Sequence, residues 1–325
     1  MISVCMCTYN GERFLREQLD SIRMQTLTPD EVVICDDAST DNTVSLIRAF
    51  INKYGLQENW RLICNEENKG YPANFYACMG ECRGELVFPA DQDDIWKPEK
   101  LEKMVRIMEA HPEISVLSCC LRAVDEKGQK LKGLLAPKEC NTGEIHEISI
   151  SEVLHKDCWA GMTLVYRNDF YRKIQSQVQD SGLPHDRALW TLAADENGFY
   201  QVDETLVCHR RHEQNTCQEE HRIGKLMRYE RKLQEIQVYM EYMQGFLSEQ
   251  VTITAPTKEA VQRKLERLQV RYDNLRERKI SKILVDYIKN HSDIRLTTVL
   301  CDLGHNFCRR GWRKDGRLPR TVSLW

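Results

Sequence analysis

Residues 84–101, GELVFPADQDDIWKPEKL, decide the fold class that this sequence predicts. Residues 86–88 form a short apolar run typical of a buried strand, and three carboxylates follow at Asp91, Asp93 and Asp94. Carboxylates at the C-terminal end of a strand lie over the crevice in which open α/β sheets bind ligands. The alternative is an ordinary solvated turn that caps the next helix, but such a turn does not explain three carboxylates together. We therefore expect an α/β sheet with a ligand site at this strand end.

The same three carboxylates indicate a metal ion. Negative charges this close to one another repel unless a cation lies among them. Hard oxygen ligands of this kind suit Mg²⁺ or Mn²⁺, and either ion can bridge the carboxylates to a phosphate. The expected cofactor is therefore Mg²⁺ or Mn²⁺, and the expected ligand carries a phosphate.

Residues 31–43, EVVICDDASTDNT, form a second acidic turn of the same kind. The apolar run at 32–35 is typical of a strand buried on both faces, and Asp36 and Asp37 follow it. A strand that turns into a capped helix would explain one of these aspartates but not the adjacent pair. A carboxylate at this place is suited to accept hydrogen bonds from a base N–H or from ribose hydroxyls.

Strands and helices alternate along this part of the chain. Residues 2–7 form an apolar run that TYNG at 8–11 breaks, apolar residues then recur at helical spacing over 14–22, and a further apolar run covers 61–64. Strands that alternate with helices imply right-handed crossovers and a mostly parallel sheet.

Four stretches together resemble family 2 glycosyltransferases of the GT-A fold. They are SVCMCTYNG at 3–11, VICDDASTDNT at 33–43, NKGYPANF at 68–75 and DQDDIWKPEKL at 91–101. The form DQDDIW is similar to the subgroup that includes bacterial rhamnosyltransferases and other surface-polysaccharide enzymes. The resemblance implies a Rossmann-like, mostly parallel mixed sheet flanked by helices, and it covers about residues 1–216.

The resemblance also implies a donor site for a nucleotide sugar. Asp91 and Asp93 stand at the family's Asp-x-Asp positions and should bind the metal ion, with Asp94 behind them, while Asp36 or Asp37 should hold the base or ribose. Asn68 and Asn74 should lie on the loop after the third strand. The expected donor-binding residues are Thr8, Tyr9, Asn10, Asp36, Asp37, Asn68, Asn74, Asp91, Arg210 and Arg211.

An acceptor site is expected in the second half of the family domain. Trp159 and Gly161 belong to a stretch that resembles the family's segment under the acceptor, and His185 should also contact the acceptor. Asp186 stands where the family carries its catalytic base, although His185 replaces an acidic residue there. The alternative for Asp186 is a plain N-cap, because a helical stretch follows at 187–194.

Residues 207–216, VCHRRHEQNT, resemble a family segment that returns to the donor. Arg210 and Arg211 should neutralise the diphosphate leaving group, and His212 is an alternative ligand of the metal. His209 and Glu213 depart from the residues common at these positions, which leaves the local backbone open.

The expected activity is an inverting, metal-dependent transfer from a nucleotide-diphosphate sugar to a glycan or lipid-linked acceptor in bacterial surface polysaccharide biosynthesis. Two alternatives remain open. A sugar nucleotidyltransferase would need a glycine-rich phosphate loop after the first strand, and TYNGE at 8–12 is not one. A catalytically inactive relative would bind a nucleotide sugar without transfer, and the substituted position at His185 keeps that reading open.

The expected domain organisation is a GT-A domain over 1–216 and a mostly helical extension over 217–325. The nucleotide-sugar half should cover 1–105 and the acceptor half 106–216. In the extension, apolar residues recur at helical spacing over 221–247 and again over 257–288, with Pro256 at the break. Helices of this kind would pack on the catalytic domain or join two copies of the chain.

The stretch 305–320 is basic and carries two aromatic residues. It predicts a peripheral contact with anionic lipid headgroups, and the alternative is a solvated tail. Its basic residues are Arg309, Arg310, Arg313, Lys314, Arg317 and Arg320.

Composition agrees with an enzyme of the cytoplasm. The net charge is −3, which gives no global signature of nucleic-acid binding, so no nucleic acid is expected as a partner. The 14 cysteines show no regular pair spacing, which argues against a disulfide framework and favours a reducing compartment. Four of them fall inside predicted buried strands, where cysteine behaves as a small apolar residue: Cys5, Cys7, Cys35 and Cys64. The strand that begins at residue 2 leaves no room for a signal peptide, and no apolar run is long enough to span a membrane. We therefore expect a cytoplasmic location, in part at the inner face of the membrane.

Overall fold

The structure, a computed structural model, describes residues 1–131, 139–156, 159–212, 229–277, 279, 281–283, 285 and 302. The chain divides into two compact units. One consists of Met1–Glu213 with Glu249–Thr257, and the other of Gln214–Ser248 with Lys258–Trp325. The domain boundary expected at residue 216 stays a prediction.

The described residues form one nine-stranded, mostly parallel mixed sheet. Its strands follow the order β3-β2-β1-β4-β8-β6-β9-β5, and β7 pairs with β9. Pairing is parallel among the first four strands and between β6 and β9, whereas β5, β7 and β8 pair antiparallel with their neighbours. The strands are β1 (Ile2–Thr8), β2 (Glu31–Asp36), β3 (Trp60–Cys64), β4 (Leu86–Ala90), β5 (Ile95–Trp96), β6 (Val116–Val124), β7 (Asn141–Glu147), β8 (Leu164–Arg167) and β9 (Phe199–Arg210). The α/β class expected from the sequence is confirmed.

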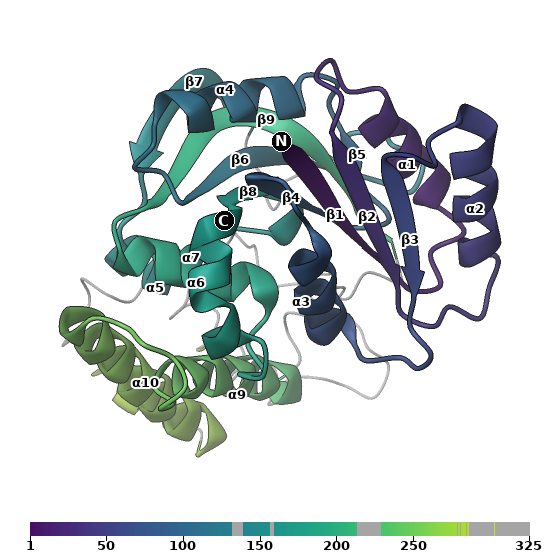
Figure 1. Ribbon diagram of the computed structural model, residues 1–325. Coiled ribbons are helices and arrows are strands. Elements are labelled where there is room, and N and C mark those ends of the chain that lie inside the picture. The colour runs from purple at the N-terminus through teal and green to yellow at the C-terminus, as the bar shows by residue number, and fades with distance from the viewer. Residues whose placement is uncertain are drawn as a thin grey trace. The chain divides into compact units, whose positions relative to one another are not determined.

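Helices cover both faces of the sheet (Figure 1). One face carries α1 (Leu15–Arg23), α2 (Thr43–Tyr54) and α4 (Lys100–Ala110), and the other carries α3 (Tyr71–Glu81), α6 (Asn168–Val178) and α7 (His185–Asp195). The short helices α5 (Ile150–Lys156) and η1 (Gly161–Thr163) lie between the later strands in the chain. Because both faces are covered, every residue of β1, β2 and β4 is buried, as in other parallel sheets.

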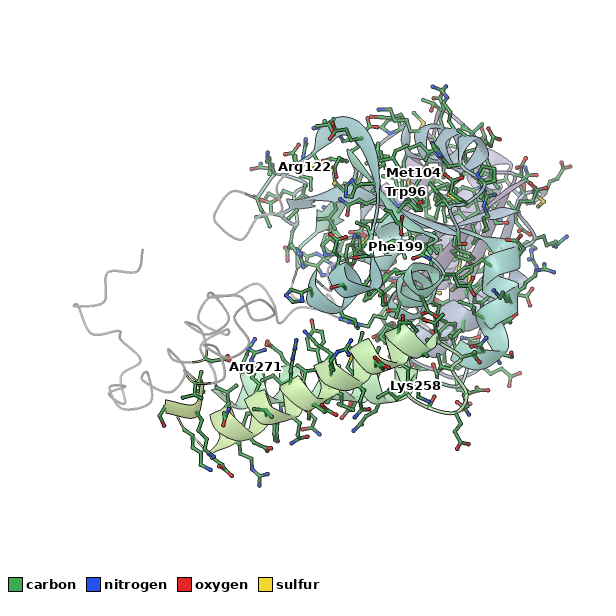
Figure 2. The ribbon with its side chains drawn as sticks, turned by 90° about the vertical axis from the view of Figure 1, so that its left-hand side faces the viewer. Trp96, Met104, Arg122, Phe199, Lys258 and Arg271 are labelled. Atoms are coloured by element: carbon green, nitrogen blue, oxygen red, sulfur yellow. The ribbon has the colours of Figure 1, made fainter. Side chains whose placement is uncertain are left out.

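The main apolar core lies between the sheet and the face of α1, α2 and α4. Leu15, Leu19 and Ile22 follow helical spacing on α1, and all three are fully buried in this core. Trp96 and Met104, both labelled in Figure 2, belong to the same core. The apolar periodicity over 14–22 therefore marks the inward face of a real helix.

Most cysteines expected inside strands are buried, but Cys64 is exposed. Cys5, Cys7 and Cys35 behave as small apolar residues of the central strands, as expected. Cys64 is the last residue of β3, and β3 is the edge strand of the sheet, so one side of it has no neighbouring strand. The prediction that Cys64 is buried was therefore wrong.

The second unit contains the helices α9 (Tyr229–Phe246) and most of α10 (Ala255–Arg276). Pro256 lies in the first turn of α10, where its missing N–H costs nothing. On α10, Arg271, labelled in Figure 2, donates to both carboxylate oxygens of Asp302 at 2.7 and 2.8 Å. Self-association through these helices stays a prediction, and the basic stretch 305–320 lies outside the described residues. Within the described part of the chain, no helix combines the length and hydrophobicity needed to span a membrane.

Candidate active site

The candidate site forms where parallel strands end together. Because β1 pairs in parallel with both β2 and β4, the carboxyl ends of the three strands meet at one edge of the sheet. Thr8 ends β1 and Asp36 ends β2, and the Thr8 hydroxyl donates to Asp36 Oδ2 at 2.8 Å. Asp91 follows directly after β4. Strand order alone therefore brings the two acidic turns of the sequence together.

Asp36 and Asp37 both lie inside the protein and hold the turns around the site. Asp36, 1 % exposed, accepts from Ser39 N at 2.9 Å and from the Ser39 hydroxyl at 2.6 Å. Asp37, 2 % exposed, accepts from Lys69 N and Gly70 N, both at 2.9 Å. Each carboxylate therefore fixes one segment of backbone at the edge of the sheet, and their predicted contact with a base or ribose stays a prediction.

Asn68 and Asn74 occupy different surroundings, although both were expected on one loop. Asn68 is exposed on the loop, as expected, and its side chain accepts from Gly70 N at 3.0 Å. Asn74 instead lies in the first turn of α3, where its amide donates to Cys35 O at 3.0 Å and accepts from Asn65 at 3.0 Å. Pro72 is compatible with the first turn of a helix, so α3 begins earlier than expected and takes Asn74 with it. Asn74 thus braces the end of β2 instead of lining the loop.

Gln92 joins the two loops that were expected to contact the donor, and the sequence argument did not single it out. Its side chain accepts from Tyr9 N at 2.9 Å and donates to Tyr9 O at 3.0 Å. A Cβ on Gly11 would lie 2.1 Å from Gln92 Oε1, so any larger residue at position 11 would displace the Gln92 side chain from its two hydrogen bonds to Tyr9. Tyr9 keeps its ring exposed, and Asn10 adopts a left-handed backbone with φ of 48°. The position of Gln92 between two aspartates was the signal available in the sequence.

Four carboxylates meet at the end of β4. Burial, together with the negative charges of Asp94, Asp93 and Asp186, raises the pKa of Asp91 well above its ordinary value. Asp186 comes from α7, so the fold brings the expected base and the expected metal ligands into one electrostatic neighbourhood. A group of like charges in this setting favours a bound cation.

Lys100 is a buried cation near these carboxylates that the sequence did not point to. It is fully buried, donates to Met162 O at 2.7 Å, and has its ammonium 3.4 Å from the centre of the Trp96 ring. Burial lowers the pKa of Lys100 to about 7, against the attraction of Asp94 and Asp91. A lysine that is only partly charged at neutral pH does not offset three or four carboxylates, so the demand for a further cation remains.

The end of β9 returns to the acidic loop, because β9 pairs antiparallel with β5 directly after that loop. His212 Nε2 lies 2.7 Å from Asp93 Oδ2, and His209 Nδ1 lies 2.9 Å from Asp94 Oδ1. The second oxygen of Asp94 is buried without a hydrogen-bond partner among the described residues. Asp93 and His212, both expected as metal ligands, therefore lie side by side.

Arg210 takes a different position from the one expected for a diphosphate contact. Its side chain is fully buried, and its guanidinium donates to Asp93 O at 3.0 Å, to Glu126 O at 2.7 Å and to Glu17 Oε2 at 2.7 Å. Successive side chains of a strand point to opposite faces, and this one faces α1. Arg210 therefore braces the backbone of the acidic loop. Arg211 is partly buried and donates its backbone N–H to Val124 O at 2.9 Å.

Gly161, His185 and Asp186 lie together, as expected for an acceptor site. A Cβ on Gly161 would lie 2.6 Å from His185 Nε2 and 3.6 Å from Asp186 Cβ. His185 stacks on Phe75 with ring centres 3.8 Å apart, and neither of its ring nitrogens has a partner among the described residues. Burial lowers the pKa of His185, so its ring is neutral near neutral pH.

Asp186 and Trp159 each differ from one expectation. The N-cap of α7 is Pro184, so Asp186 lies within the first turn, and its carboxylate accepts from Arg187 N at 2.8 Å. Trp159 was expected to contact the acceptor, but it is buried, and its indole donates to Gln201 at 2.8 Å. Trp159 O also accepts from the indole of Trp190 at 3.1 Å, and this hydrogen bond links Trp159 to α7.

Comparison with known proteins assigns the chain to a family. The model of glycosyl transferase family 2 matches residues 3–173. The chain is 35% identical over 209 residues to the putative glycosyltransferase EpsE of Bacillus subtilis. This alignment covers 63% of this chain and 71% of EpsE. It is 31% identical over 214 residues to the uncharacterised protein Rv1520 of Mycobacterium tuberculosis, covering 65% of this chain. That match spans 59% of the length of the mycobacterial relative.

Two solved structures share the fold at low sequence identity. TarS of S. aureus, residues 1–349 in complex with UDP-GlcNAc, matches with a TM-score of 0.59 at 18% identity, over 82% of this chain and 72% of that chain. The mannosyltransferase PcManGT of Pyrobaculum calidifontis, in complex with GDP-Man and Mn²⁺, matches with a TM-score of 0.58 at 15% identity, over 94% of this chain and 85% of that chain. The chain belongs to glycosyl transferase family 2, and its fold is of the GT-A type.

The raised pKa of Asp91 predicts how the metal-free protein responds to pH. As pH rises from the ordinary carboxyl range through that raised pKa, the unfolded chain has already lost the proton that the folded chain still holds, so the free energy of unfolding falls. In the presence of chelator, the free energy of unfolding of Asp91→Asn should not show this decrease. The variant should therefore be more stable than the wild type at neutral pH, and the difference in free energy of unfolding should shrink toward pH 4. Chemical denaturation over this pH range measures it.

Asp180→Asn is the matched control for Asp91→Asn, since Asp180 is an exposed aspartate away from the cluster. Mn²⁺ should raise the melting temperature of the wild type and of the control, but not that of Asp91→Asn. Parallel pH profiles for the wild type and Asp91→Asn would contradict this account of the carboxylate cluster.

Proposed function

We propose that this chain is an inverting, metal-dependent glycosyltransferase that moves a sugar from a nucleotide-diphosphate sugar to a glycan or lipid-linked acceptor in bacterial surface polysaccharide biosynthesis. The observation that carries the proposal is that Asp186, on α7, lies near enough to Asp91 for its charge to contribute to the raised pKa of that carboxyl. Transfer to an acceptor hydroxyl needs a base close to the leaving group, and in this proposal Asp186 would be the base while the carboxylates after β4 would hold the metal ion. Membership of family 2 supports the same reaction class.

The donor is proposed to lie over the carboxyl ends of β1, β2 and β4. Tyr9 is exposed there and Asn10 borders it, while Asn68 is exposed on the loop held by Asp37. TarS and PcManGT were solved with UDP-GlcNAc and GDP-Man, which supports a nucleotide sugar as the class of donor. Asp36 or Asp37 would meet the base or ribose through one of its remaining lone pairs.

Asp91, Asp93 and His212 would hold the Mg²⁺ or Mn²⁺ ion. Two oxygen ligands and an imidazole fit such an ion, and burial together with the neighbouring carboxylates raises the pKa of Asp91, as expected of a group that favours a cation. The unpartnered oxygen of Asp94 lies behind them. When bound, the ion supplies positive charge against the diphosphate of the donor.

In the proposed mechanism, the carboxylate of Asp186 takes the proton of the acceptor hydroxyl as the hydroxyl oxygen attacks the anomeric carbon. A new C–O bond forms on one face of the sugar while the bond to the diphosphate breaks on the other face. A single displacement of this kind inverts the anomeric centre and needs no nucleophile from the protein. Arg211 would face the charge on the departing diphosphate.

The buried residues around Asp186 would keep the acceptor in place. His185 is neutral, stacked on Phe75 and in contact with Gly161, so its ring nitrogens can exchange hydrogen bonds with a sugar hydroxyl without adding charge. Trp159 is linked to α7 through Trp190, and its contact with the acceptor stays a prediction. Arg210 acts as a positioning residue for the acidic loop.

Donor and metal binding provide the first test. Thermal-shift measurements with UDP-, GDP- and TDP-sugars in the presence of Mn²⁺ should identify one base that raises the melting temperature, and chelator should remove that shift. Asp93→Ala should keep its fold and lose most of the shift and of the turnover, whereas Asp180→Ala should keep both. Full turnover in excess EDTA would contradict the metal requirement, and a chain that binds the donor but never transfers would be an inactive relative.

Asp186→Asn tests the proposed base. The variant should bind donor almost as the wild type does, yet transfer should fall by roughly 10²–10⁴-fold, the range expected when a general base is removed. Asp169→Asn is a closely matched control, because Asp169 also lies in the first turn of a helix and accepts from the next backbone N–H, at 2.7 Å. Near-wild-type transfer by Asp186→Asn would place the base elsewhere, and weak donor binding would make Asp186 a donor ligand instead.

The basic stretch 305–320 is proposed to hold the enzyme at an anionic membrane surface, near a lipid-linked acceptor. Each basic residue close to such a surface contributes about 1 kcal/mol. The full-length chain should therefore co-sediment with vesicles that contain anionic lipid, and less so as salt is added. Replacement of Arg309, Arg310 and Arg313 by Glu should abolish the binding to vesicles. If the wild type and this triple variant both stay in the supernatant at low salt, the proposed membrane contact is refuted.

A further inference from the structure

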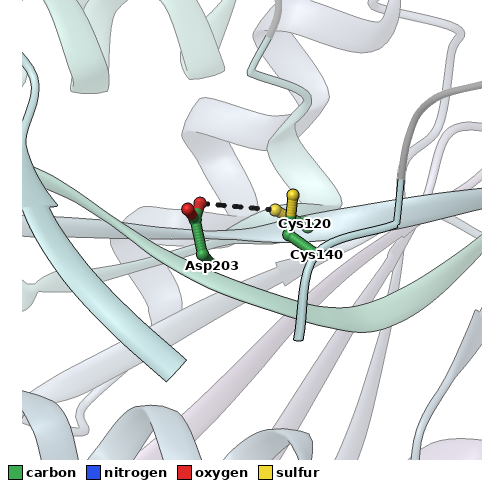
Figure 3. A group of neighbouring side chains, drawn as sticks. All are labelled: Cys120, Cys140 and Asp203. Carbon is green, nitrogen blue, oxygen red and sulfur yellow. Dashed lines mark hydrogen bonds between the residues drawn. The ribbon is translucent and has the colours of Figure 1, made fainter. Parts of the chain in front are cut away.

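A second group of metal-ligating side chains lies on the sheet, apart from the residues assigned to donor and acceptor. It consists of Cys120 in β6, Cys140 directly before β7 and Asp203 in β9 (Figure 3). One ligand atom from each residue lies within 4.8 Å of the other two. The Cys120 sulfur is 3.9 Å from Asp203 Oδ1, and both cysteines are thiols.

The backbone departs from regular pairing at this group. Cys119 pairs with Val202, but the next residue, Cys120, pairs with Thr205, so β9 carries extra residues at this point. The pairing of β7 with β9 is also irregular here, between Asn141 and Ile145. Bulges re-aim side chains that a regular ladder would place elsewhere. Irregularities on both sides of β9 therefore bring the side chains of three separate segments together.

Cys140 is held firmly although it precedes its strand. Its N–H donates to the Thr205 hydroxyl at 3.2 Å, and its carbonyl accepts from Thr205 N at 2.8 Å. Asp203 is held as well, since the Gln201 amide donates to Asp203 Oδ1 at 2.9 Å. A carboxylate oriented by a neighbouring hydrogen bond is typical of metal sites.

The charges near the group favour a cation. Burial, together with Cys140 and Asp203, raises the pKa of the Cys120 thiol to about 12. Arg122 lies two residues further along β6, but its guanidinium pairs with Glu139. Two thiols and a carboxylate thus converge here, and a metal ion would displace the thiol protons.

We propose that Cys120, Cys140 and Asp203 bind a thiophilic divalent cation, for which Zn²⁺ is the expected ion. Thiolates select Zn²⁺ over Mg²⁺ and Mn²⁺, which prefer oxygen ligands. With a Zn–S bond of about 2.3 Å, tetrahedral ligands lie about 3.8 Å apart, so the group needs to close by no more than about 1 Å from its 4.8 Å limit. Water would complete the four ligands.

The site would tie the start of β7, which pairs with β9 alone, to the interior of the sheet. It also connects to the acceptor segment, because Gln201 donates to Asp203 and accepts from the Trp159 indole at 2.8 Å. A metal here would therefore stabilise the support beneath α7 without touching the reacting groups.

Cobalt substitution tests the site on the full-length chain. Reduced protein freed of metal should show the near-ultraviolet charge-transfer band of thiolate-bound Co²⁺, and this band should saturate at one equivalent of thiolate-bound ion. The oxygen and imidazole ligands at Asp91, Asp93 and His212 cannot produce the band, even if they also bind Co²⁺. Zn²⁺ should displace the Co²⁺ and abolish the band. Cys120→Ser and Cys140→Ser should each lose most of the band, and Asp203→Asn should weaken binding about 10-fold or more.

Cys64→Ser is the control, because Cys64 is an exposed thiol on another strand, and its band should equal that of the wild type. A measurement on the wild type alone covers the case in which a variant does not fold: Zn²⁺ should slow the alkylation of Cys120 and Cys140, read by mass spectrometry, but not that of Cys64. The proposal fails if the reduced wild type shows no thiolate band, if the band persists in both serine variants, or if Cys120 and Cys140 form a disulfide and are not protected by Zn²⁺.

Discussion

Mutual repulsion among carboxylates at one edge of the sheet is the constraint on which the rest of the site depends. Asp91 follows a fully buried strand, so its charge is poorly solvated, and α7 adds the charge of Asp186 to it. The only buried amine nearby, among the described residues, is Lys100, and burial lowers its pKa to about 7. The fold therefore places a negative electrostatic potential at this strand end. A divalent cation can neutralise it and can bind a diphosphate at the same time.

The segment that ends β9 counters this potential with backbone and side-chain contacts. Arg210 is the largest fully buried side chain of the described residues, and it joins the acidic loop to α1 through Asp93 and Glu17. The buried guanidinium needs these carbonyl and carboxylate contacts, because a buried charge without compensation is strongly destabilising. The histidine contacts to Asp93 and Asp94 depend on this anchor, since His209 precedes Arg210 directly and His212 follows two residues after it.

One sheet thus presents two different sets of side chains that we propose as metal ligands. The strand ends of the parallel half offer carboxylates and an imidazole, which suit a hard ion that meets a phosphate. The bulged half around β9 offers two thiols and a carboxylate, which suit a soft ion with a structural role. Because the two sets differ in ligand chemistry, each would select its own kind of ion. Hydrogen bonds of Gln201 to Asp203 and to the Trp159 indole connect the second set with the residues that support α7.

The sequence by itself determined the family, the α/β class and the strands that end in acidic turns, because apolar runs and the carboxylates after them are patterns of near neighbours. Tertiary structure decided the surroundings of individual side chains. Asn74 became a brace because α3 begins early, Arg210 faces α1 because of its place in the strand alternation, and Trp159 is buried under α7. Cys120 and Asp203 meet only because β9 bulges beside β6. Such contacts join residues far apart in the chain, so they depend on which strands pair and in which register, and no local pattern of the sequence contains that information.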